Sequence, residues 1–285
     1  MIKIIYNKLS RNGKSMEIVH KVEETLKNEN KEYMLVDVHD VEDKEKFIAA
    51  FEKEDEAIIL GGDGTIHHLA NRICDYLREG KLTNKIYLYR AGTGNDFIRD
   101  VKKEIKNNMV CLNDHLTYLP TIEFKNQSRY FVNGVGLGID ALICKKVNES
   151  ENKTKGNYFK NVLKSLKEYH KSSVRVIVDG KEYKYDKVLF TTIMHGRYFG
   201  GGMKITPSQK RDTDELSVVI INKLAKPFLA LLLPTVYLGW HTIFPIVHIH
   251  KGKNIEIIFD EDKHLQLDGE VEENIRSIKA YKKPL

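Results

Sequence analysis

The sequence predicts a two-domain protein that combines an α/β first domain with a β-rich second domain. In the first part of the chain, short apolar runs alternate with segments whose apolar residues recur at helical spacing. After about residue 118, most segments have strand composition and are separated by turn residues. The alternation indicates a parallel sheet with helices on both faces, and the series of strands indicates a β-sandwich. We place the boundary near residue 120, which gives domains of 1–120 and 121–285.

The first domain is expected to begin as a regular series of strands and helices. The expected strands are Ile2–Tyr6, Tyr33–Val38, Ala57–Leu60 and Lys85–Tyr89. The expected helices are 14–29, Asp43–Phe51 and one that begins near Ile66. In parallel sheets of this kind, ligands bind beyond the carboxyl ends of the strands.

The second domain is expected to contain eight strands and one helix. The strands are Tyr118–Phe124, Ser128–Asn133, Ser173–Val178, Tyr183–Thr191, Leu216–Ile221, Val247–His250, Asn254–Phe259 and Lys263–Leu267. The helix covers about Tyr158–Tyr169. Asp179-Gly180 lies between two of the strands and is typical of a tight hairpin turn.

The third strand leads into the turn Gly61-Gly62-Asp63-Gly64-Thr65. Glycines accept positive φ and have no Cβ, so a ligand can approach the backbone of this turn closely. Backbone N–H groups at the start of the following helix favour a phosphate. A carboxylate would repel that phosphate unless a magnesium ion lay between them, so Asp63 is expected to act through metal or in catalysis. The alternative is an ordinary glycine turn with a capping aspartate.

A second polar turn, Ala91 to Phe97, follows the fourth strand and is expected at the same edge of the sheet. Neither turn has the spacing of a dinucleotide fingerprint or a P-loop. Asn12-Gly13-Lys14-Ser15 contains Gly-Lys-Ser but lacks the glycine that a P-loop has five residues earlier.

Composition excludes some functions and favours others. The formal net charge is +6, but basic and acidic residues are interleaved, so no nucleic-acid-binding stripe stands out. A mild excess of positive charge suits an anionic membrane surface or nucleotide phosphates. Three widely spaced cysteines, Cys74, Cys111 and Cys144, argue against a disulfide framework or zinc site and favour a reducing compartment. The apolar run at the N-terminus, Met1 to Tyr6, is too short for a signal peptide and is expected to be a strand.

One apolar segment, Phe228 to Val247, raises the question of membrane contact. Pro234, Gly239 and Pro245 interrupt it, and its apolar runs are far shorter than the ~20 residues of a spanning helix. It is either a buried helix or an interfacial element; Tyr237 and Trp240 are types that favour the headgroup zone.

Several motifs, in this order, resemble the lipid kinase family built on the diacylglycerol kinase catalytic domain. They are Gly61–Thr65, Gly92-Thr93-Gly94-Asn95-Asp96-Phe97, Phe131–Ala141, Gly200-Gly201-Gly202-Met203 with Pro207, and Asp268-Gly269-Glu270. The first motif is shared with NAD kinases and resembles one in phosphofructokinases. The second and third point to the lipid branch. The resemblance implies a Rossmann-like, NAD kinase-like first domain and leaves open a return of the C-terminal end of the chain to that domain.

The resemblance implies ATP- and Mg²⁺-dependent phosphorylation of a lipid hydroxyl in a cleft between the two domains. ATP phosphates would lie at Gly61, Gly62, Asp63, Gly64 and Thr65, with Gly92, Thr93, Asn95 and Asp96 on the neighbouring turn and Asn7 on the first loop. Asp63 and Asp96 would hold magnesium. Asp268 would be the general base, and Glu270 would orient it or share its charge.

Three further expectations come from the resemblance. Relatives hold a second, structural magnesium through an Asp-Gly pair after the motif proline, but Thr213-Asp214 stands there in this chain. Asp212 and Asp214 flank the expected carboxylate, so this site is either rebuilt or lost. The enzyme would be cytoplasmic and peripheral at the inner membrane face. It could dimerise through the β-rich domain.

Diacylglycerol is the expected acceptor, and sphingoid bases, ceramide and phosphatidylglycerol remain open. A kinase for a soluble substrate such as NAD is one alternative. A nucleotide-binding regulator without catalysis is another, although the retained Asp63, Asn95, Asp96, Asp268 and Glu270 argue against it. A nucleic-acid-binding module is the least favoured.

Overall fold

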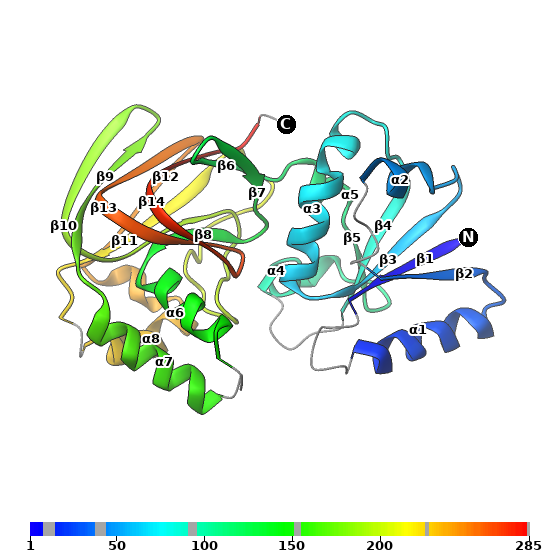
Figure 1. The fold of residues 1–285 in the computed structure, drawn as a ribbon, viewed down its shortest axis with the longest axis horizontal. Helices are drawn as coiled ribbons and strands as arrows, with labels where there is room; N and C mark the ends of the chain where they lie inside the picture. Colours follow the sequence, from blue (N-terminus) through cyan, green and yellow to red (C-terminus); the bar gives the residue numbers. More distant parts are fainter. Residues whose placement is uncertain (8–14, 38–43, 91–95, 151–154, 226–227, 284–285) are drawn as a thin grey trace. The chain divides into compact units, whose positions relative to one another are not determined.

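A computed structural model describes residues 1–7, 15–37, 44–90, 96–150, 155–225 and 228–283. The chain divides into two compact units, Met1–Leu119 and Pro120–Leu285. Figure 1 shows the helices and strands of each unit along the chain.

Unit 1 contains a sheet of five strands in the order β2-β1-β3-β4-β5. The strands are β1 (Ile2–Tyr6), β2 (Tyr33–Asp37), β3 (Glu56–Gly61), β4 (Lys85–Arg90) and β5 (Met109–Cys111). The first four are parallel, as the sequence predicts, and β5 is an antiparallel edge strand that the sequence analysis missed. β5 has only three residues, which is too short for a clear periodic signal.

Helices cover both faces of this sheet. They are α1 (Ser15–Asn28), α2 (Lys44–Ala49), α3 (Asp63–Arg78), α4 (Asp96–Asp100) and α5 (Asn113–Thr117). Val19, Val22 and Leu26 of α1 pack on Ile4 and Ile58. The other face carries α3, whose Ile66, Leu69, Ala70 and Ile73 are buried and which contacts α2 and α5 (Figure 1). The expected helices are therefore confirmed, because their apolar spacing gives each one a single core-facing stripe.

Unit 2 contains a sheet of nine strands whose path is β12-β11-β10-β8-β13-β14-β6-β7, with β9 paired to both β10 and β13. The strands are β6 (Thr121–Phe124), β7 (Gln127–Tyr130), β8 (Gly134–Gly138), β9 (Ser172–Val178), β10 (Lys181–Met194), β11 (Leu216–Asn222), β12 (Val247–Gly252), β13 (Asn254–Leu267) and β14 (Glu270–Tyr281).

Two long strands fold this sheet onto itself. The first half of β10 pairs with β9 and its second half with β8, and β13 divides its pairing between the same two strands. Both strands shift register in the middle, between Val188 and Phe190 in β10 and between Ile258 and Lys263 in β13. A bulge increases local twist and bends a strand, so these shifts let one sheet form both layers of a sandwich.

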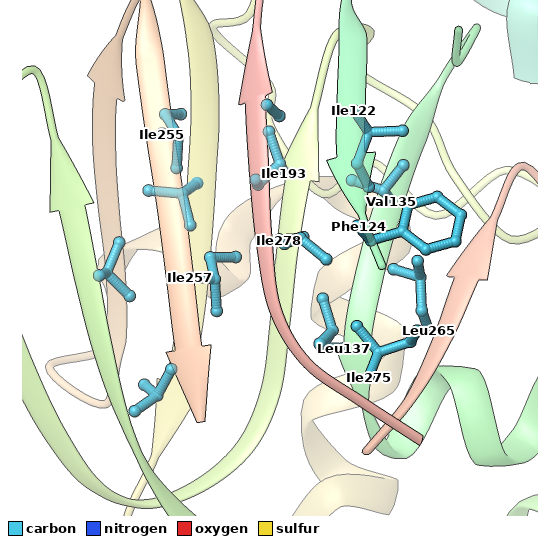
Figure 2. Packing of buried hydrophobic residues seen from close by; sticks show 14 of the residues in the cluster. Ile122, Phe124, Val135, Leu137, Ile193, Ile255, Ile257, Leu265, Ile275 and Ile278 are labelled. Atoms are coloured by element: carbon cyan, nitrogen blue, oxygen red, sulfur yellow. The ribbon is translucent and has the colours of Figure 1, made fainter. Parts of the chain in front are cut away.

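The space between the layers is filled by branched aliphatic side chains and phenylalanines. Figure 2 shows Val135 and Leu137 of β8 with Ile255 and Ile257 of β13, together with Ile275 and Ile278 of β14. These residues are at most 1% exposed. Burial of branched residues on alternate positions fixes the register, because a shift of one residue would turn the apolar set outward.

The described part of unit 2 also contains three α-helices, α6 (Ile139–Asn148), α7 (Lys155–Glu168) and α8 (Leu229–Leu238). A second apolar cluster joins Ile139, Val162 and Leu166 to Leu232 and Val236. The expected helix at Tyr158–Tyr169 corresponds to α7, which begins three residues earlier.

The sequence analysis was wrong about several strands of unit 2. The two strands expected at Asn254–Phe259 and Lys263–Leu267 are one continuous strand, β13. β8, β14 and α6 were missed. The strand expected at Ser128–Asn133 ends at Tyr130, because the backbone N–H groups of Val132 and Asn133 hydrogen-bond to the side chain of Asp268 instead of to a neighbouring strand.

Candidate functional site

The carboxyl ends of β1, β3 and β4 lie side by side at one edge of the unit 1 sheet. Tyr6 is level with Leu60, and Gly61 is level with Arg90. From β1 the chain continues to β2 on one side, and from β3 it continues to β4 on the other side, so the strand order reverses between β1 and β3. Open α/β sheets bind ligands in the crevice at such a switch point. Asn7 follows β1, and the turn at Gly61–Thr65 follows β3. The structure therefore brings these two predicted segments to the same edge.

The turn from β3 into α3 is tight for a steric reason. A Cβ on Gly61 would lie 2.3 Å from Oγ1 of Thr65, so only glycine fits there. Thr65 and Ile66 donate backbone hydrogen bonds to the Gly62 carbonyl at 3.0 and 3.1 Å. None of the three glycines of this turn, Gly61, Gly62 and Gly64, has a positive φ. Close approach, rather than a left-handed backbone, therefore explains Gly61.

Asp63, the first residue of α3, connects the two predicted turns of unit 1. Its Oδ2 accepts a hydrogen bond from the backbone N–H of Asp96 at 2.9 Å, and its Oδ1 accepts one from Phe97 at 3.0 Å. Asp63 therefore caps the start of α4 as well as standing at the start of α3. This contact agrees with the capping interpretation of the aspartate, and it also fixes the distance between the Gly61–Thr65 turn and Asp96.

Asp96 is 5% exposed and lies at the first position of α4. The other predicted residues of the second turn, Gly92, Thr93 and Asn95, lie outside the described residues. Among the described residues, no group of three or more His, Cys, Asp or Glu side chains could hold a metal ion. Magnesium commonly binds through one or two carboxylates, several waters and substrate phosphates. Both oxygens of Asp63 accept backbone N–H groups, so a metal held by Asp63 and Asp96 would need most of its ligands from water and a nucleotide.

In unit 2, Asp268 lies at the tip of the hairpin that joins β13 to β14. Asp268 has φ +48° and Gly269 has φ +103°, which makes a two-residue turn with both residues left-handed. Asp is one of the few side chains that adopt this conformation readily. The turn explains why the dipeptide Asp-Gly stands here, and it points the carboxylate of Asp268 back along the sheet.

Three backbone N–H groups hold that carboxylate. Val132 donates to Oδ2 at 2.5 Å, and Asn133 and Gly134 donate to Oδ1 at 2.8 and 3.2 Å. The segment Phe131–Gly134, which we call the strap, thus joins two predicted motifs that are about 135 residues apart in the sequence. Charge-assisted hydrogen bonds of this kind fix the orientation of a carboxylate.

Behind the strap lies Arg211, which the sequence analysis did not identify. Its Nη1 donates to the Val132 carbonyl at 2.6 Å, and its Nη2 donates to Oδ1 of Asn133 at 2.6 Å. The planar guanidinium makes these contacts through two separate nitrogens in a fixed fork, a geometry that the single ammonium of a lysine does not offer. The sequence signal for Arg211 was weak, because an arginine in a loop is common and its partners lie nearly 80 residues away.

His195 completes the support of the strap. Its backbone N–H donates to the Asn133 carbonyl at 2.9 Å, and Nδ1 lies 3.1 Å from the Val132 carbonyl. Burial, together with the positive charges of Arg211 and Lys282, lowers the pKa of His195 well below 6.5. The imidazole is therefore neutral at pH 7 and donates Nδ1–H to Val132. This contact gives a structural role to the segment Met194–Arg197.

Glu270, the other predicted catalytic residue, is the first residue of β14 and, like Asp268, is partly exposed. Arg129 lies between two glutamates, 3.5 Å from Glu270 and 2.9 Å from Glu272. Asp268 and Glu270 therefore lie two residues apart at the same turn but have different partners.

Asp140 is a fully buried carboxylate at the junction of β8 and α6. A Cβ on Gly136 would lie 1.8 Å from its Oδ2, so glycine at 136 makes room for it. Burial raises the pKa of Asp140 from 3.8 to about 7. The predicted motif Phe131–Ala141 therefore contains two distinct parts: the strap that holds Asp268, and a buried acid that titrates near neutral pH.

The residues at the expected second magnesium do not fit a divalent cation. Asp214 pairs with Lys253 at 3.0 Å. The ammonium of Lys282 donates to the carbonyls of Arg211 at 2.5 Å and Thr213 at 2.7 Å, so a lysine provides the positive charge in this loop. We therefore derive no role for a metal at Asp212 and Asp214.

Comparison with known proteins agrees with this arrangement. The family described as "Diacylglycerol kinase catalytic domain" matches residues 1–117. The family described as "YegS C-terminal NAD kinase beta sandwich-like domain" matches residues 133–279, which is more than half of the chain. The first family covers the sheet edge with Asp63 and Asp96, and the second covers Asn133 and Gly134 of the strap together with Asp268.

Curated relatives and solved structures are similar over most of their length. "Putative lipid kinase YtlR" of Bacillus subtilis is 27% identical over 233 residues, which cover 75% of this chain and 73% of the relative. "Diacylglycerol kinase" of Staphylococcus saprophyticus is 26% identical over 227 residues, covering 76% and 70%. A crystal structure titled "putative diacylglycerol kinase" from Bacillus anthracis has the same fold, with a TM-score of 0.68, 17% identity, and coverage of 99% of this chain and 92% of that one. The chain belongs to the diacylglycerol kinase-like family of lipid kinases, which are nucleotide-dependent phosphotransferases.

Proposed function

We propose that this enzyme transfers the γ-phosphoryl group of ATP, with Mg²⁺, to the hydroxyl of diacylglycerol and so forms phosphatidic acid. The family and its curated relatives support a lipid kinase. The observation that carries the proposal is the fixed carboxylate of Asp268, which the strap holds with three N–H groups. Such a group can accept a proton from an alcohol without first losing its orientation.

ATP would bind at the carboxyl edge of the unit 1 sheet. The turn at Gly61–Thr65 and the start of α3 favour negative charge, because backbone N–H groups and the helix dipole are positive there. Asp63 and Asp96 would hold the magnesium ion, which when bound neutralises charge on the phosphates. Asn7, together with Gly92, Thr93 and Asn95, would contact the nucleotide.

In the transfer step, the acceptor oxygen bonds to the γ-phosphorus while the bond from that phosphorus to the β–γ bridging oxygen breaks. The bridging oxygen leaves with ADP and keeps the electron pair. The proton of the hydroxyl moves to the Asp268 carboxylate. Glu270 and Arg129 would set the charge around this group. We further propose that the enzyme is cytoplasmic and meets its substrate at the inner membrane face, and that it forms a homodimer through unit 2.

The first experiment supplies labelled ATP and Mg²⁺ to vesicles that contain diacylglycerol, a sphingoid base, ceramide or phosphatidylglycerol, with NAD as a soluble control. Label in diacylglycerol is expected. Label in another lipid would change the acceptor and keep the mechanism. Label in NAD alone would refute the lipid assignment. Tight ATP binding without any transfer would instead indicate a regulator.

The role of Asp268 is tested by Asp268→Asn, with Asp179→Asn as a matched control. Asp179 lies in a similar two-residue turn, with φ +47° at Asp179 and +84° at Gly180, and its carboxylate also accepts backbone N–H groups. Both substitutions should therefore cost similar stability. Asp268→Asn should lower kcat by about 10²- to 10⁴-fold, while Asp179→Asn should not. Equal turnover in the two variants would exclude Asp268 as the base.

A further inference from the structure

Most of the large exposed apolar side chains of the described residues lie in one short segment. Of the eleven, seven fall between Phe228 and Phe244, on α8 and the 3-10 helix η5 (Trp240–Ile243). The seven are Phe228 (56% exposed), Leu231 (70%), Tyr237 (49%), Leu238 (55%), Trp240 (62%), Ile243 (77%) and Phe244 (37%). We call this set the apolar patch. Clusters of exposed apolar side chains mark binding surfaces, whereas single ones are ordinary.

The inner side of the same segment is firmly attached to unit 2. Leu232 and Val236 are buried in the apolar cluster below α8. The carbonyl of Val236 accepts a hydrogen bond from the Lys204 backbone at 3.1 Å, and Nε2 of the buried His241 lies 3.0 Å from the Ile205 carbonyl. Gly239, with φ +78°, lies so close to Pro207 that a Cβ would be 2.8 Å from it. The apolar patch is therefore presented by a fixed element.

The part of the sequence that contains the apolar patch has basic but no acidic residues, although one of its lysines, Lys253, pairs with Asp214 from outside it. Residues 216–255 contain no aspartate or glutamate but contain four lysines, and Lys223 is exposed just before the segment. Burial also lowers the pKa of His241, so its imidazole adds no charge within the patch at neutral pH. An apolar surface on an acid-free segment, with the exposed Lys223 next to it, suits a layer of anionic headgroups above acyl chains.

The size of the segment distinguishes docking from spanning. α8 has ten residues, which give a length of about 15 Å, half of the ~30 Å hydrocarbon thickness of a bilayer. None of the helices in the described part of the chain is long and apolar enough to cross a membrane. A short helix that is apolar on all sides, with tyrosine and tryptophan at its end, suits the headgroup–acyl boundary.

We propose that the apolar patch docks the enzyme onto an anionic phospholipid bilayer, with Leu231, Trp240 and Ile243 inserted below the headgroups. The proposal deepens the proposed function and rests on it for its purpose, because a lipid kinase must reach a substrate held in a bilayer. Docking itself needs no nucleotide and no catalysis, so it is measured separately.

Trp240 is the single tryptophan of the chain and therefore reports on the patch directly. The full-length protein is titrated, without ATP, with vesicles of phosphatidylcholine alone or mixed with phosphatidylglycerol. The emission of Trp240 should shift to shorter wavelength with the mixed vesicles, and phospholipids brominated on their acyl chains should quench it. Vesicles that sediment the protein with no change in Trp240 emission would show that another surface docks, which would overturn the proposal.

The variant Leu231→Gln/Ile243→Gln keeps Trp240 and removes two exposed side chains of the patch. Met34→Gln/Leu35→Gln is the matched control, because these residues are also exposed apolar side chains (42% and 37%) but lie on β2 of unit 1. The patch variant should bind mixed vesicles at least about tenfold more weakly than the wild type. The control should bind as the wild type does. Equal binding by the patch variant would refute the docking role.

Two further readouts separate the remaining outcomes. If the patch joins two copies of the chain, sedimentation will show a dimer without vesicles that the patch variant dissociates, and the bilayer proposal fails. Activity is measured on a short-chain diacylglycerol dispersed as monomers. The patch variant should keep wild-type turnover there and lose it on vesicles. If the wild type docks but phosphorylates no lipid in either form, the proposed function fails and the docking surface stands.

Discussion

At the scale of single residues, two aspartates in turns serve as hydrogen-bond acceptors for backbone N–H groups. Asp63 caps α4, and Asp268 is held by the strap. In both cases the carboxylate to which we assign a chemical role by proposal is also a carboxylate that the local fold needs. A substitution at either position therefore changes structure and chemistry together, and a test of catalysis needs a control for structure.

Asp140 gives a prediction on pH and stability. Its pKa in the folded chain, about 7, lies above its ordinary value of 3.8, so the folded state binds the proton more tightly. The stabilisation from this group is complete below about pH 4 and is lost as the pH rises to 7. This pKa difference of about three units corresponds to at most about 4 kcal/mol of unfolding free energy. Asp140→Asn should therefore raise the unfolding free energy at pH 8 relative to the wild type.

The measurement is denaturant unfolding of the wild type and Asp140→Asn between pH 4 and pH 8. The difference in unfolding free energy between the wild type and Asp140→Asn should grow through this pH range and level off above pH 7. Asp262→Asn, an exposed position, should show no such trend. A difference that stays constant with pH would refute the titration of Asp140 in the folded protein.

Arg211 is predicted to be a positioning residue for Asp268. Arg211→Met removes two hydrogen bonds of 2.6 Å that hold Val132 and Asn133, whose N–H groups fix the carboxylate. We expect kcat to fall by roughly tenfold or more with little change in KM for ATP, because displacement of a reacting group costs turnover rather than nucleotide affinity. Arg211→Lys should recover only part of kcat.

Steady-state kinetics on lipid vesicles test this prediction. Arg175→Met is the control, since Arg175 is an exposed residue of β9 that makes only a long contact, 3.9 Å, with the Glu182 carboxylate. If Arg211→Met loses stability but keeps kcat, the arginine supports the fold and has no part in positioning Asp268.

At the scale of elements, the passage from β8 into α6 depends on Gly136. Gly136→Ala places a Cβ 1.8 Å from Oδ2 of Asp140 inside the unit 2 core, so something must move. The expected cost is about 2–3 kcal/mol of unfolding free energy. Adding Asp140→Ala removes the clashing atoms and should recover part of that loss, which gives a favourable coupling in a double-mutant cycle.

Thermal or denaturant unfolding of the single and double variants measures this coupling. Gly64→Ala serves as the comparison, because a Cβ at position 64 meets nothing within 4 Å. It should change stability little. Strict additivity of Gly136→Ala and Asp140→Ala would contradict the packing described for this junction.

Elements with a regular pattern could be predicted from the sequence, and those created by tertiary pairing could not. The helices α1 and α3 have one apolar stripe each, and β1 and β3 are short apolar runs. β8 reads Gly-Val-Gly-Leu-Gly, and glycine lowers any strand signal, yet its pairing with β10 and β13 places it in the core. β14 is rich in charge and turns only Ile275, Ile278 and Ala280 inward.

At the scale of the whole molecule, the chain divides into Met1–Leu119 and Pro120–Leu285, and our proposal places the nucleotide on the first unit alone. We predict that ATP with Mg²⁺ slows hydrogen exchange at the start of α3 in unit 1, because the bound phosphates would take up backbone N–H groups there. Asp63→Asn should lose most of this protection through weaker nucleotide binding.

Hydrogen exchange followed by mass spectrometry, with and without ATP, makes this measurement. Peptides from β11 and β12, which lie in unit 2, serve as the internal control. Protection confined to unit 2 would place the nucleotide elsewhere and contradict the site at Asp63 and Asp96.

The sequence alone determined the α/β-plus-β plan, the family motifs and most of the candidate residues, because periodicity and glycine turns are local properties of the chain. Only the tertiary structure decided which groups meet. It paired Asp268 with the strap about 135 residues away, placed Arg211 behind that strap, and put the Lys282 ammonium where a second magnesium was expected. It also decided that Leu232 and Val236 are buried in unit 2 while the seven side chains of the apolar patch are exposed. These outcomes depend on contacts between distant parts of the chain, which no local pattern encodes.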